Sequence, residues 1–378
     1  MAAMSYSYGV QFLRNRGRQP GEKIPAMEHL HGLSREAVKA LTGRDPLAEP
    51  DALNEIYQEV ARQLDVDLNW GVGLPMPGDE MHDWSDGERV KTNRDGHPVV
   101  QWGVFHVLAQ EDGRHFLHVP KPRDIDEALA FDPLQWFPKT VEDYEEEFSR
   151  EYKRMLTSCG DAVYPIPHHY TTCFHWPLAI FGFELLCEAG MEEDDFHALM
   201  ERFAEISRRI TTAWSRVEGL EGFILHDDLT MSSGPIFAPD WYLRHVFPFY
   251  PGIFEPLKAK GIPIIFTSDG DCSAFMDDVF AAGADGFNFE YLVDLETVAN
   301  RHPDKILVGN FNNATIADGP KDKIREEIGR TIEVGRHVPG YVANVGGGLT
   351  HQIPLEHLQY YLGLRSSQCR LERNPLSS

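Results

Sequence analysis

The chain has 378 residues, of which 42% are apolar and 25% are charged, proportions typical of a soluble globular protein. Its formal net charge of −24 argues against a nucleic-acid or anionic-membrane partner, because both require a basic surface. The five cysteines include no Cys-x-x-Cys pair, which predicts reduced thiols and a cytoplasmic location. Residues 1–10 carry no signal pattern, and the longest apolar stretch, residues 176–187, is too short to span a bilayer.

The N-terminal segment alternates between predicted strands and helices. Apolar runs at residues 24–28 and 67–71 predict the first two strands. Apolar residues at helical spacing predict helices at residues 35–41 and 53–64, with Ser34 as the N-cap of the first.

Residues 75–120 interrupt this alternation. Gly and Pro turn signals surround short alternating runs there, of which residues 99–107 and 116–119 are the clearest. They predict a β-hairpin excursion from the main fold. An acidic helix at residues 141–156 and a third strand at residues 162–165 follow the excursion.

The rest of the chain repeats one pattern, in which a short apolar run ends in polar residues and a helical segment follows. A loop dense in histidine and aromatic residues leads into a buried helix, a long helical region follows at residues 191–217, and the last helix is expected at residues 354–364. Five further strands are expected at residues 223–225, 262–266, 285–288, 306–309 and 341–343. This alternation predicts an α/β protein with eight parallel strands, a (β/α)8 TIM barrel. We expect one domain over residues 1–365 and a C-terminal tail over residues 366–378.

Polar residues at the strand ends predict the active site. In a parallel barrel all carboxyl strand ends lie at one rim, where the chemistry takes place. His226, Asp227 and Asp228 follow the fourth strand, Asp269 the fifth and Glu290 the sixth. Adjacent strands lie about 5 Å apart, so these groups can meet at one divalent metal or act as acids and bases. His226, Asp269 and Glu290 are therefore candidate metal ligands, and Asp228, Asp269 and Glu290 are candidate catalytic groups. The alternative is that the aspartates cap turns.

Other residues near the strand ends are expected to bind substrate. His168, His169 and His175 lie close together among aromatic residues, which is typical of a substrate wall, although single loop histidines are usually structural. The glycines at 346–348 can offer backbone donors to an anion, and Cys272 is read as a small buried residue. The candidate substrate-binding residues are Glu28, His29, His168, His169, Tyr170, Asn310, Asn312 and His351.

Several long segments resemble the uroporphyrinogen decarboxylase superfamily, which also includes cobalamin- and coenzyme-M-linked methyltransferases. The matching segments are HDDLTMSSGPIFAPDWYLRHVFPFYPGIFEPLKAKGIPIIFTSDGD, DDVFAAGADGFNFE, DLETVANRHPDKILVGNFN and GRHVPGYVANVGGGLTHQIPLEHL, all within residues 222–364. The opening FLRNRGRQPGEKIPAMEHL is similar to the N-terminal segment of the family. The resemblance implies the same barrel, with a deep cleft at the carboxyl rim.

Two motifs depart from well-known members of this superfamily. Uroporphyrinogen decarboxylases carry an Arg-rich motif at the first strand, where this chain has Glu28, whose carboxylate is expected to repel a porphyrinogen. The zinc methyltransferases use His-x-Cys after the fifth strand, where this chain has Thr267, Ser268 and Asp269. The Ser-Asp-Gly sequence is similar to members that demethylate small methoxylated or methylamine compounds and pass the methyl group to a corrinoid protein.

Three functions follow from these observations. The leading expectation is a methyltransferase that acts on a small methylated or methoxylated compound, with a corrinoid on a partner protein as acceptor and one divalent metal, zinc before others. The first alternative is a decarboxylase or lyase acting on a non-porphyrin substrate. The second is a non-catalytic binding subunit that has lost the metal motif of the family. The expected partners are a small-molecule substrate and a corrinoid protein, with no nucleic acid and no membrane; the oligomeric state, a homodimer included, is left open.

Overall fold

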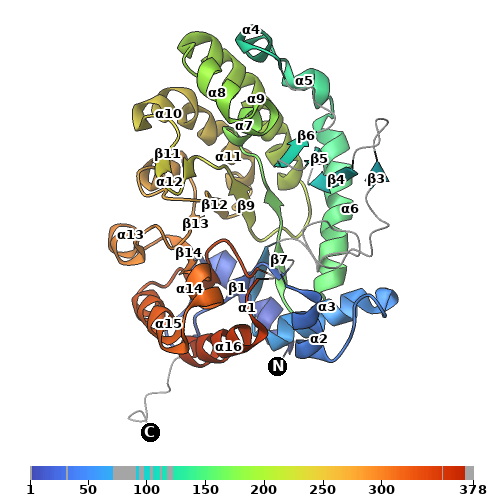
Figure 1. The fold of residues 1–378 in the computed structure, drawn as a ribbon, viewed down its shortest axis with the longest axis vertical. Coiled ribbons are helices and arrows are strands. Elements are labelled where there is room, and N and C mark those ends of the chain that lie inside the picture. The colour runs from blue at the N-terminus through green and yellow to red at the C-terminus, as the bar shows by residue number, and fades with distance from the viewer. Residues whose placement is uncertain are drawn as a thin grey trace.

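The computed structural model describes residues 2–30, 33–70, 91–92, 98–102, 105–110, 113–116, 122–350 and 352–370. Within them, parallel strands form a closed barrel surrounded by helices (Figure 1). The barrel strands are β1 (Met27–Glu28), β2 (Leu68–Trp70), β7 (Tyr164–Ile166), β8 (His168–His169), β9 (Phe223–His226), β12 (Ile264–Thr267), β13 (Gly286–Asn288), β14 (Ile306–Phe311) and β15 (Tyr341–Val345). β7 and β8 are separated only by Pro167 and share one position, so the predicted eight-stranded barrel is confirmed.

The barrel closes between its first and last strands. Strands β1, β2 and β7 pair in that order, and β8, β9, β12, β13, β14 and β15 continue the parallel pairing. Ala26, just before β1, forms a parallel bridge with Ala343 on β15. The N–H of Ala343 donates to the carbonyl oxygen of Pro25 at 2.9 Å.

Helices cover the outer face of the barrel, and Figure 1 shows them around the strands. They are α1 (Ala2–Asn15), α2 (Arg35–Thr42), α3 (Leu53–Gln63), α4 (Ile125–Leu129), α5 (Pro133–Trp136), α6 (Val141–Cys159), α7 (His175–Phe181), α8 (Phe183–Ala189), α9 (Glu193–Ser215), α10 (Pro239–His245), α11 (Tyr250–Lys258), α12 (Met276–Ala282), α13 (Leu295–Arg301), α14 (Asn313–Asp318), α15 (Lys321–Arg336) and α16 (Leu355–Cys369), with 3₁₀ turns at Pro50–Ala52 and Phe247–Phe249. As expected, Ser34 caps α2 by accepting from the N–H of Ala37. α16 continues beyond the expected end at Leu364, so the first residues of the expected tail are helical.

The long helix α9 shows why the helical spacing in the sequence is informative. Its buried residues recur every three or four positions, for example Phe196, Met200, Phe203, Ser207 and Ile210, so one face packs against the rest of the protein. On the same face Ser207 accepts a hydrogen bond from the buried indole of Trp176 on α7 at 2.8 Å.

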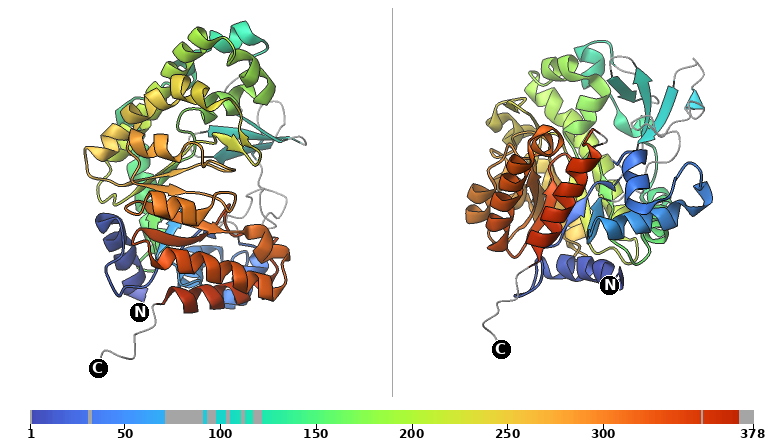
Figure 2. Two further views of the ribbon diagram at one scale, coloured as in Figure 1. Left: turned by 90° about the vertical axis from the view of Figure 1, so that its left-hand side faces the viewer. Right: turned by 60° about the horizontal axis from the view of Figure 1, so that its bottom comes forward.

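The excursion in the N-terminal third is larger than a hairpin. Strands β3 (Lys91–Thr92), β4 (Pro98–Trp102), β5 (Phe105–Gln110) and β6 (Gly113–Phe116) form an antiparallel sheet in chain order. The run predicted at residues 99–107 is thus divided between two strands that pair with each other. In the left view of Figure 2, this sheet and helix α1 lie at opposite ends of the barrel strands.

The interior of the barrel is apolar below its carboxyl end. Alternate residues of the strands point inward, and their side chains form one cluster with two residues of α1. Phe12 and Leu13 thereby cover the amino-terminal end of the barrel. The strand residues of this cluster are Met27, Leu68, Trp70, Tyr164, Ile166, Ile224, Ile265, Ile306, Val308 and Val342. In the described part of the chain, no helix combines the length and apolar character needed to cross a bilayer.

Candidate functional site at the carboxyl end of the barrel

The layer above this apolar interior is polar and aromatic. Because side chains alternate along a strand, the next inward position lies two residues further on. Counted this way, each of the eight strands of the barrel contributes one residue to this layer, with β7 and β8 counted as one strand. These residues are His29, Trp70, His168, His226, Thr267, Asn288, Asn310 and Asn344. The carboxyl end of the barrel therefore offers imidazole and hydroxyl groups and the amide of Asn288 to a ligand, whereas the amide N–H₂ groups of Asn310 and Asn344 donate to backbone carbonyls.

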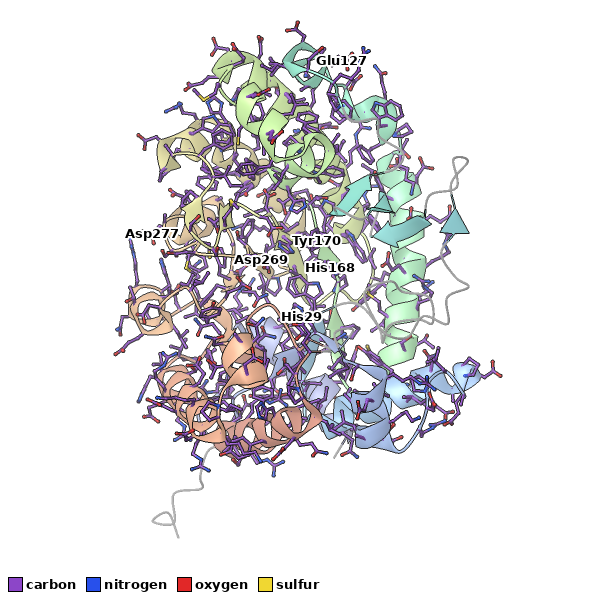
Figure 3. All side chains as sticks on the ribbon, viewed as in Figure 1. His29, Glu127, His168, Tyr170, Asp269 and Asp277 are labelled. Atoms are coloured by element: carbon purple, nitrogen blue, oxygen red, sulfur yellow. The ribbon has the colours of Figure 1, made fainter. Side chains whose placement is uncertain are left out.

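Trp70 lies at the centre of the histidines in this layer. Its indole is 4.5 Å from the ring of His29, 5.5 Å from that of His168 and 6.0 Å from that of His226, measured between ring centroids. Tyr170 also packs on His226, with their ring centroids 4.3 Å apart. In Figure 3, His29, His168, Tyr170 and Asp269 lie near one another in the centre of the view, whereas Asp277 and Glu127 lie at its periphery. These aromatic rings form a wall beside the carboxylates.

Asp228 connects two imidazoles. Nε2 of His226 donates to Oδ1 of Asp228 at 2.7 Å, and Nδ1 of His175 lies 3.0 Å from its Oδ2. The backbone N–H of Asp269 also points to Oδ1 of Asp228, at 3.3 Å. One ligand atom each from His226, Asp228 and Asp269 lie within 4.8 Å of one another, which is close enough to bind a single metal ion.

The environment of this cluster shifts the pKa of each member. Burial acts to lower the pKa of His226, but the negative charge of Asp228, with smaller effects of Asp269 and Asp227, raises it to about 9. Burial acts to raise the pKa of Asp228, yet the two imidazoles hold it well below its usual value. Asp269 is exposed at the barrel mouth, but partial loss of water and the carboxylates of Asp228 and Glu290 outweigh the attraction of His226 and raise its pKa to about 6.

Glu290 lies beside the cluster rather than in it. Its carboxylate accepts from the backbone N–H of Gly270 at 2.9 Å. Of the three expected metal ligands, the structure thus brings His226 and Asp269 together, with Asp228 instead of Glu290 as the third member. Gly270 holds the loop in place: its φ is +78°, and a Cβ atom there would lie 2.5 Å from the carbonyl oxygen of Met231.

Glu28 does not line the barrel mouth, contrary to expectation. Its carboxylate is fully buried, faces outward to α16 and accepts hydrogen bonds from Arg365 at 2.7 Å and from Tyr361. Burial raises the pKa of Glu28, and these two partners oppose that effect. Because its charge is balanced by Arg365, the expected repulsion of a porphyrinogen by Glu28 does not operate.

Three other expected substrate ligands have structural roles. His169 points outward, is buried against Trp176 at 5.9 Å between ring centroids, and is not part of the mouth. Asn310 donates to the carbonyl oxygens of Glu290 and Val293, which fixes the loop after β13. Asn312 is the N-cap of α14. These roles follow from strand alternation and capping, which compete with ligand binding for the same residue types.

The remaining expected ligands fall at the mouth or outside the described residues. His29, His168 and Tyr170 lie in the aromatic wall, whereas His351 is outside the described residues. The glycine loop packs on this wall, since a Cβ atom on Gly348 would lie 2.7 Å from Nδ1 of His29. Cys272 is buried and burial raises the pKa of its thiol, as expected of a small core residue.

Two residues of the site were not assigned from the sequence. Trp70 is the last residue of β2, and the alternation from Leu68 would have placed it at the mouth. His175 was noted only as part of a substrate wall, because its contact with Asp228 depends on how the loop after β8 folds onto β9.

The fold defines a (β/α)8 barrel with acidic, imidazole and aromatic groups at its carboxyl end. A family model described as uroporphyrinogen decarboxylase (URO-D) matches residues 184–366. Two proteins named uroporphyrinogen decarboxylase share sequence with the chain. That of Pelobacter propionicus is 25% identical over 167 residues, 44% of this chain and 47% of the relative. That of Geotalea uraniireducens is 27% identical over 124 residues, which are 33% of this chain and 36% of the relative. The chain thus matches less than half the length of either relative.

A solved structure, the methyltransferase from Methanosarcina mazei, has the same fold. The TM-score is 0.60 at 15% sequence identity, over 95% of this chain and 97% of that one. Residues 184–366, just under half of the chain, are thus similar to the URO-D family, and the chain as a whole shares its barrel fold with the M. mazei methyltransferase. The family match contains His226, Asp228, Asp269 and Glu290, whereas the aromatic wall and His175 precede it.

Proposed function

We propose that the protein is a methyltransferase that demethylates a small methylated or methoxylated compound and passes the methyl group to a corrinoid carried by a partner protein. The observation that carries this proposal is the charge of the barrel mouth. Asp228, Asp269 and Glu290 gather there, and among the described residues none of them forms an ion pair with Lys or Arg.

This charge favours methyl transfer over uroporphyrinogen decarboxylation, the two activities associated with the superfamily. A porphyrinogen carries several carboxylates, and a site that binds them needs cationic partners, Arg above all. The carboxylates of the described mouth have no Lys or Arg partner, and the side chains that pair with Asp228 are imidazoles, so the mouth opposes a polyanion and tolerates a small neutral or cationic compound. The likeness to the M. mazei methyltransferase concerns the fold, so the choice between activities depends on these charges.

The residues at the mouth fit one divalent metal. His226, Asp228 and Asp269 offer one nitrogen and two oxygen donors, a set that suits zinc. The buried Nδ1 of His226 has no hydrogen-bond partner among the described residues, so it can bind an ion once the ion displaces its proton. A bound ion would act as a Lewis acid toward the heteroatom that carries the methyl group.

The chain itself supplies orientation and a proton. When the methyl group leaves, the oxygen or nitrogen of the substrate gains an electron pair that must be protonated or otherwise stabilised. In a site without a bound metal, Nδ1 of His226 and the carboxyl group of Asp269 can supply this proton at the mouth. Tyr170 and the rings around Trp70 provide a wall that can pack against an apolar or aromatic part of the substrate.

A second candidate is a decarboxylase or lyase acting on a substrate smaller than a porphyrinogen. The observation that favours it is the match of residues 184–366 to the URO-D family model. The same proton donors would then protonate the carbon that loses the carboxylate. A non-catalytic binding subunit is the third candidate, and it predicts no turnover with any donor.

The experiment that tests the proposal measures methyl transfer to free cob(I)alamin. Purified protein, loaded with zinc and analysed for metal, is mixed with cob(I)alamin and either 2-methoxyphenol or trimethylamine. We expect the absorbance of cob(I)alamin to decline as methylcob(III)alamin forms with one of these donors. Asp269→Asn should abolish the reaction, and Asp277→Asn, an exposed aspartate on α12, should leave it unchanged. Release of CO2 from uroporphyrinogen without any methyl transfer would contradict the proposal.

A further inference from the structure

Asp227, between the two charged residues of the mouth, has a different role from its neighbours. Its carboxylate is fully buried and accepts the backbone N–H groups of Cys173, Phe174 and His175 at 2.9, 2.9 and 2.6 Å. The hydroxyl of Tyr250 on α11 donates to the same carboxylate at 2.8 Å. Asp227 therefore binds the first turn of α7 from a different part of the chain.

The residue before Asp227 anchors the same loop. The carbonyl oxygen of His226 accepts from the backbone N–H of Thr172 at 2.9 Å and from its hydroxyl at 3.0 Å. The segment from Thr172 to His175 is thus held entirely on the end of β9. A shift of this segment would break several hydrogen bonds to buried groups, which is costly.

This anchoring places His175 against the candidate site. Its Nδ1 lies 3.0 Å from Oδ2 of Asp228, while Oδ1 of Asp228 accepts from Nε2 of His226. The ring of Tyr170 packs on both imidazoles, at 5.2 Å from His175 and 4.3 Å from His226. Each oxygen of Asp228 therefore faces a different histidine, and rotation of the carboxylate would lose both contacts.

We propose that His175 is a positioning residue, held by Asp227, that fixes the orientation of the Asp228 carboxylate and through it the ring of His226. This inference rests on the proposed function only in that Asp228 and His226 belong to the working site. The physical reason is general: groups bonded to a ligand or catalytic side chain set its orientation, and their loss weakens metal binding about 10–100-fold.

The first test uses NMR of metal-free protein labelled with ¹⁵N-histidine to detect the ring N–H of His226. In the wild type we expect a slowly exchanging N–H signal from Nε2, protected by its bond to Asp228. His175→Phe keeps a planar ring beside Tyr170 but removes the nitrogen, and should shift and broaden this signal. His175→Asn places an amide N–H where Nδ1 lies and should restore the signal. His197→Phe, a change on α9 that alters a histidine bonded to a backbone carbonyl, should leave it unchanged.

The outcome that overturns the proposal is a His226 signal that is identical in wild type and His175→Phe, with thermal midpoints showing both proteins folded. If His175→Phe does not fold, His175→Gln replaces it. The amide of Gln lies where Nε2 of His175 lies, so this variant also lacks an N–H group at the position of Nδ1. A signal retained equally in the Gln and Asn variants would then contradict the proposal.

The second test titrates the same proteins with Co²⁺ and follows its visible absorption. His175→Phe should bind Co²⁺ about 10–100-fold more weakly than wild type, and His175→Asn should bind within a few-fold of it. Equal affinity of the wild type and His175→Phe would overturn the positioning role. If the wild type binds no Co²⁺, the metal site of the proposed function is wrong, and the histidine signals alone decide the role of His175.

Discussion

Arg365 on α16 and Glu28 on β1 form an ion pair in which both side chains are fully buried, with Nη1 2.7 Å from Oε1. The guanidinium also donates to the carbonyl oxygen of Leu64, at the end of α3, and the hydroxyl of Tyr361 donates to the same oxygen of Glu28. The last helix is thereby tied to the first strand of the barrel.

We predict that Arg365→Met lowers the free energy of unfolding by about 3–5 kcal/mol, because it leaves the carboxylate of Glu28 buried without its charged partner. Urea unfolding measures this change. Arg123→Met is the control, since Arg123 forms an exposed pair with Glu127, and it should not change the urea midpoint measurably. Equal midpoints for Arg365→Met and Arg123→Met would show that the buried pair does not stabilise the fold.

This pair also shows where the sequence was insufficient. The apolar runs with polar ends predicted the eight strands, because burial on both faces imposes that pattern on parallel strands. The direction of a single side chain was not predictable at the first strand, since the partner of Glu28 lies far along the chain on α16. From the sequence alone, a carboxylate at a strand end is therefore predicted to belong to the site, and only its partner in the structure shows otherwise.

The candidate site was predictable in part for a related reason. Neighbouring strand ends brought His226 and Asp269 together, as parallel pairing requires. That Asp228, and not Glu290, is the third member of the cluster could not be predicted. The reason is local: Glu290 accepts a hydrogen bond from the N–H of Gly270, and the spacing of residues in the sequence does not indicate such a bond. Asn312, in contrast, precedes a helix, and its capping role could have been read from the sequence.

The second prediction concerns Asp227→Asn. Its carboxylate accepts three backbone N–H groups, and an amide would point its own N–H₂ at some of these donors. We expect the free energy of unfolding to fall by about 2–3 kcal/mol, the usual value for a lost hydrogen bond to a buried charged group. Asp240→Asn, an exposed residue at the start of α10, should unfold like the wild type. If both variants unfold at the wild-type urea concentration, Asp227 does not hold the loop.

The third prediction is a pH dependence of stability caused by His169. Burial, with a smaller effect of His175, lowers the pKa of His169 from 6.5 to about 3. Between these values the unfolded chain binds a proton at this histidine and the folded protein does not, so stability falls as the pH falls. From pH 7 to pH 5 the loss due to His169 should be about 2 kcal/mol.

Urea unfolding of the wild type and His169→Gln at both pH values isolates this effect. The variant should lose less stability than the wild type on acidification. His337→Gln, which removes an exposed histidine, should keep the wild-type pH dependence. An unchanged pH dependence in His169→Gln would mean that folding does not lower the pKa of His169.

The fourth prediction compares two glycines with similar backbone angles. Gly270 has φ +78° and a close approach to the carbonyl oxygen of Met231, whereas Gly219 has φ +81° and open space around its Cβ position. Gly219→Ala should therefore cost only the backbone strain, about 1–2 kcal/mol. Gly270→Ala should cost more, because the loop that carries Asp269 must also move, and it should reduce metal binding. Thermal midpoints and Co²⁺ titration check this difference, and indistinguishable results for the two variants would refute it.

The central claim is that the mouth of this barrel transfers a methyl group to a corrinoid. The most direct measurement follows the label of a CD₃-substituted donor, either the methoxy group of 2-methoxyphenol or trimethylamine, into cobalamin by mass spectrometry. We predict CD₃-cobalamin with the wild type and with Asp277→Asn, and none with Asp269→Asn. Formation of no labelled cobalamin by metal-loaded wild-type protein, from either donor and with a corrinoid protein as well as free cob(I)alamin, would contradict the account.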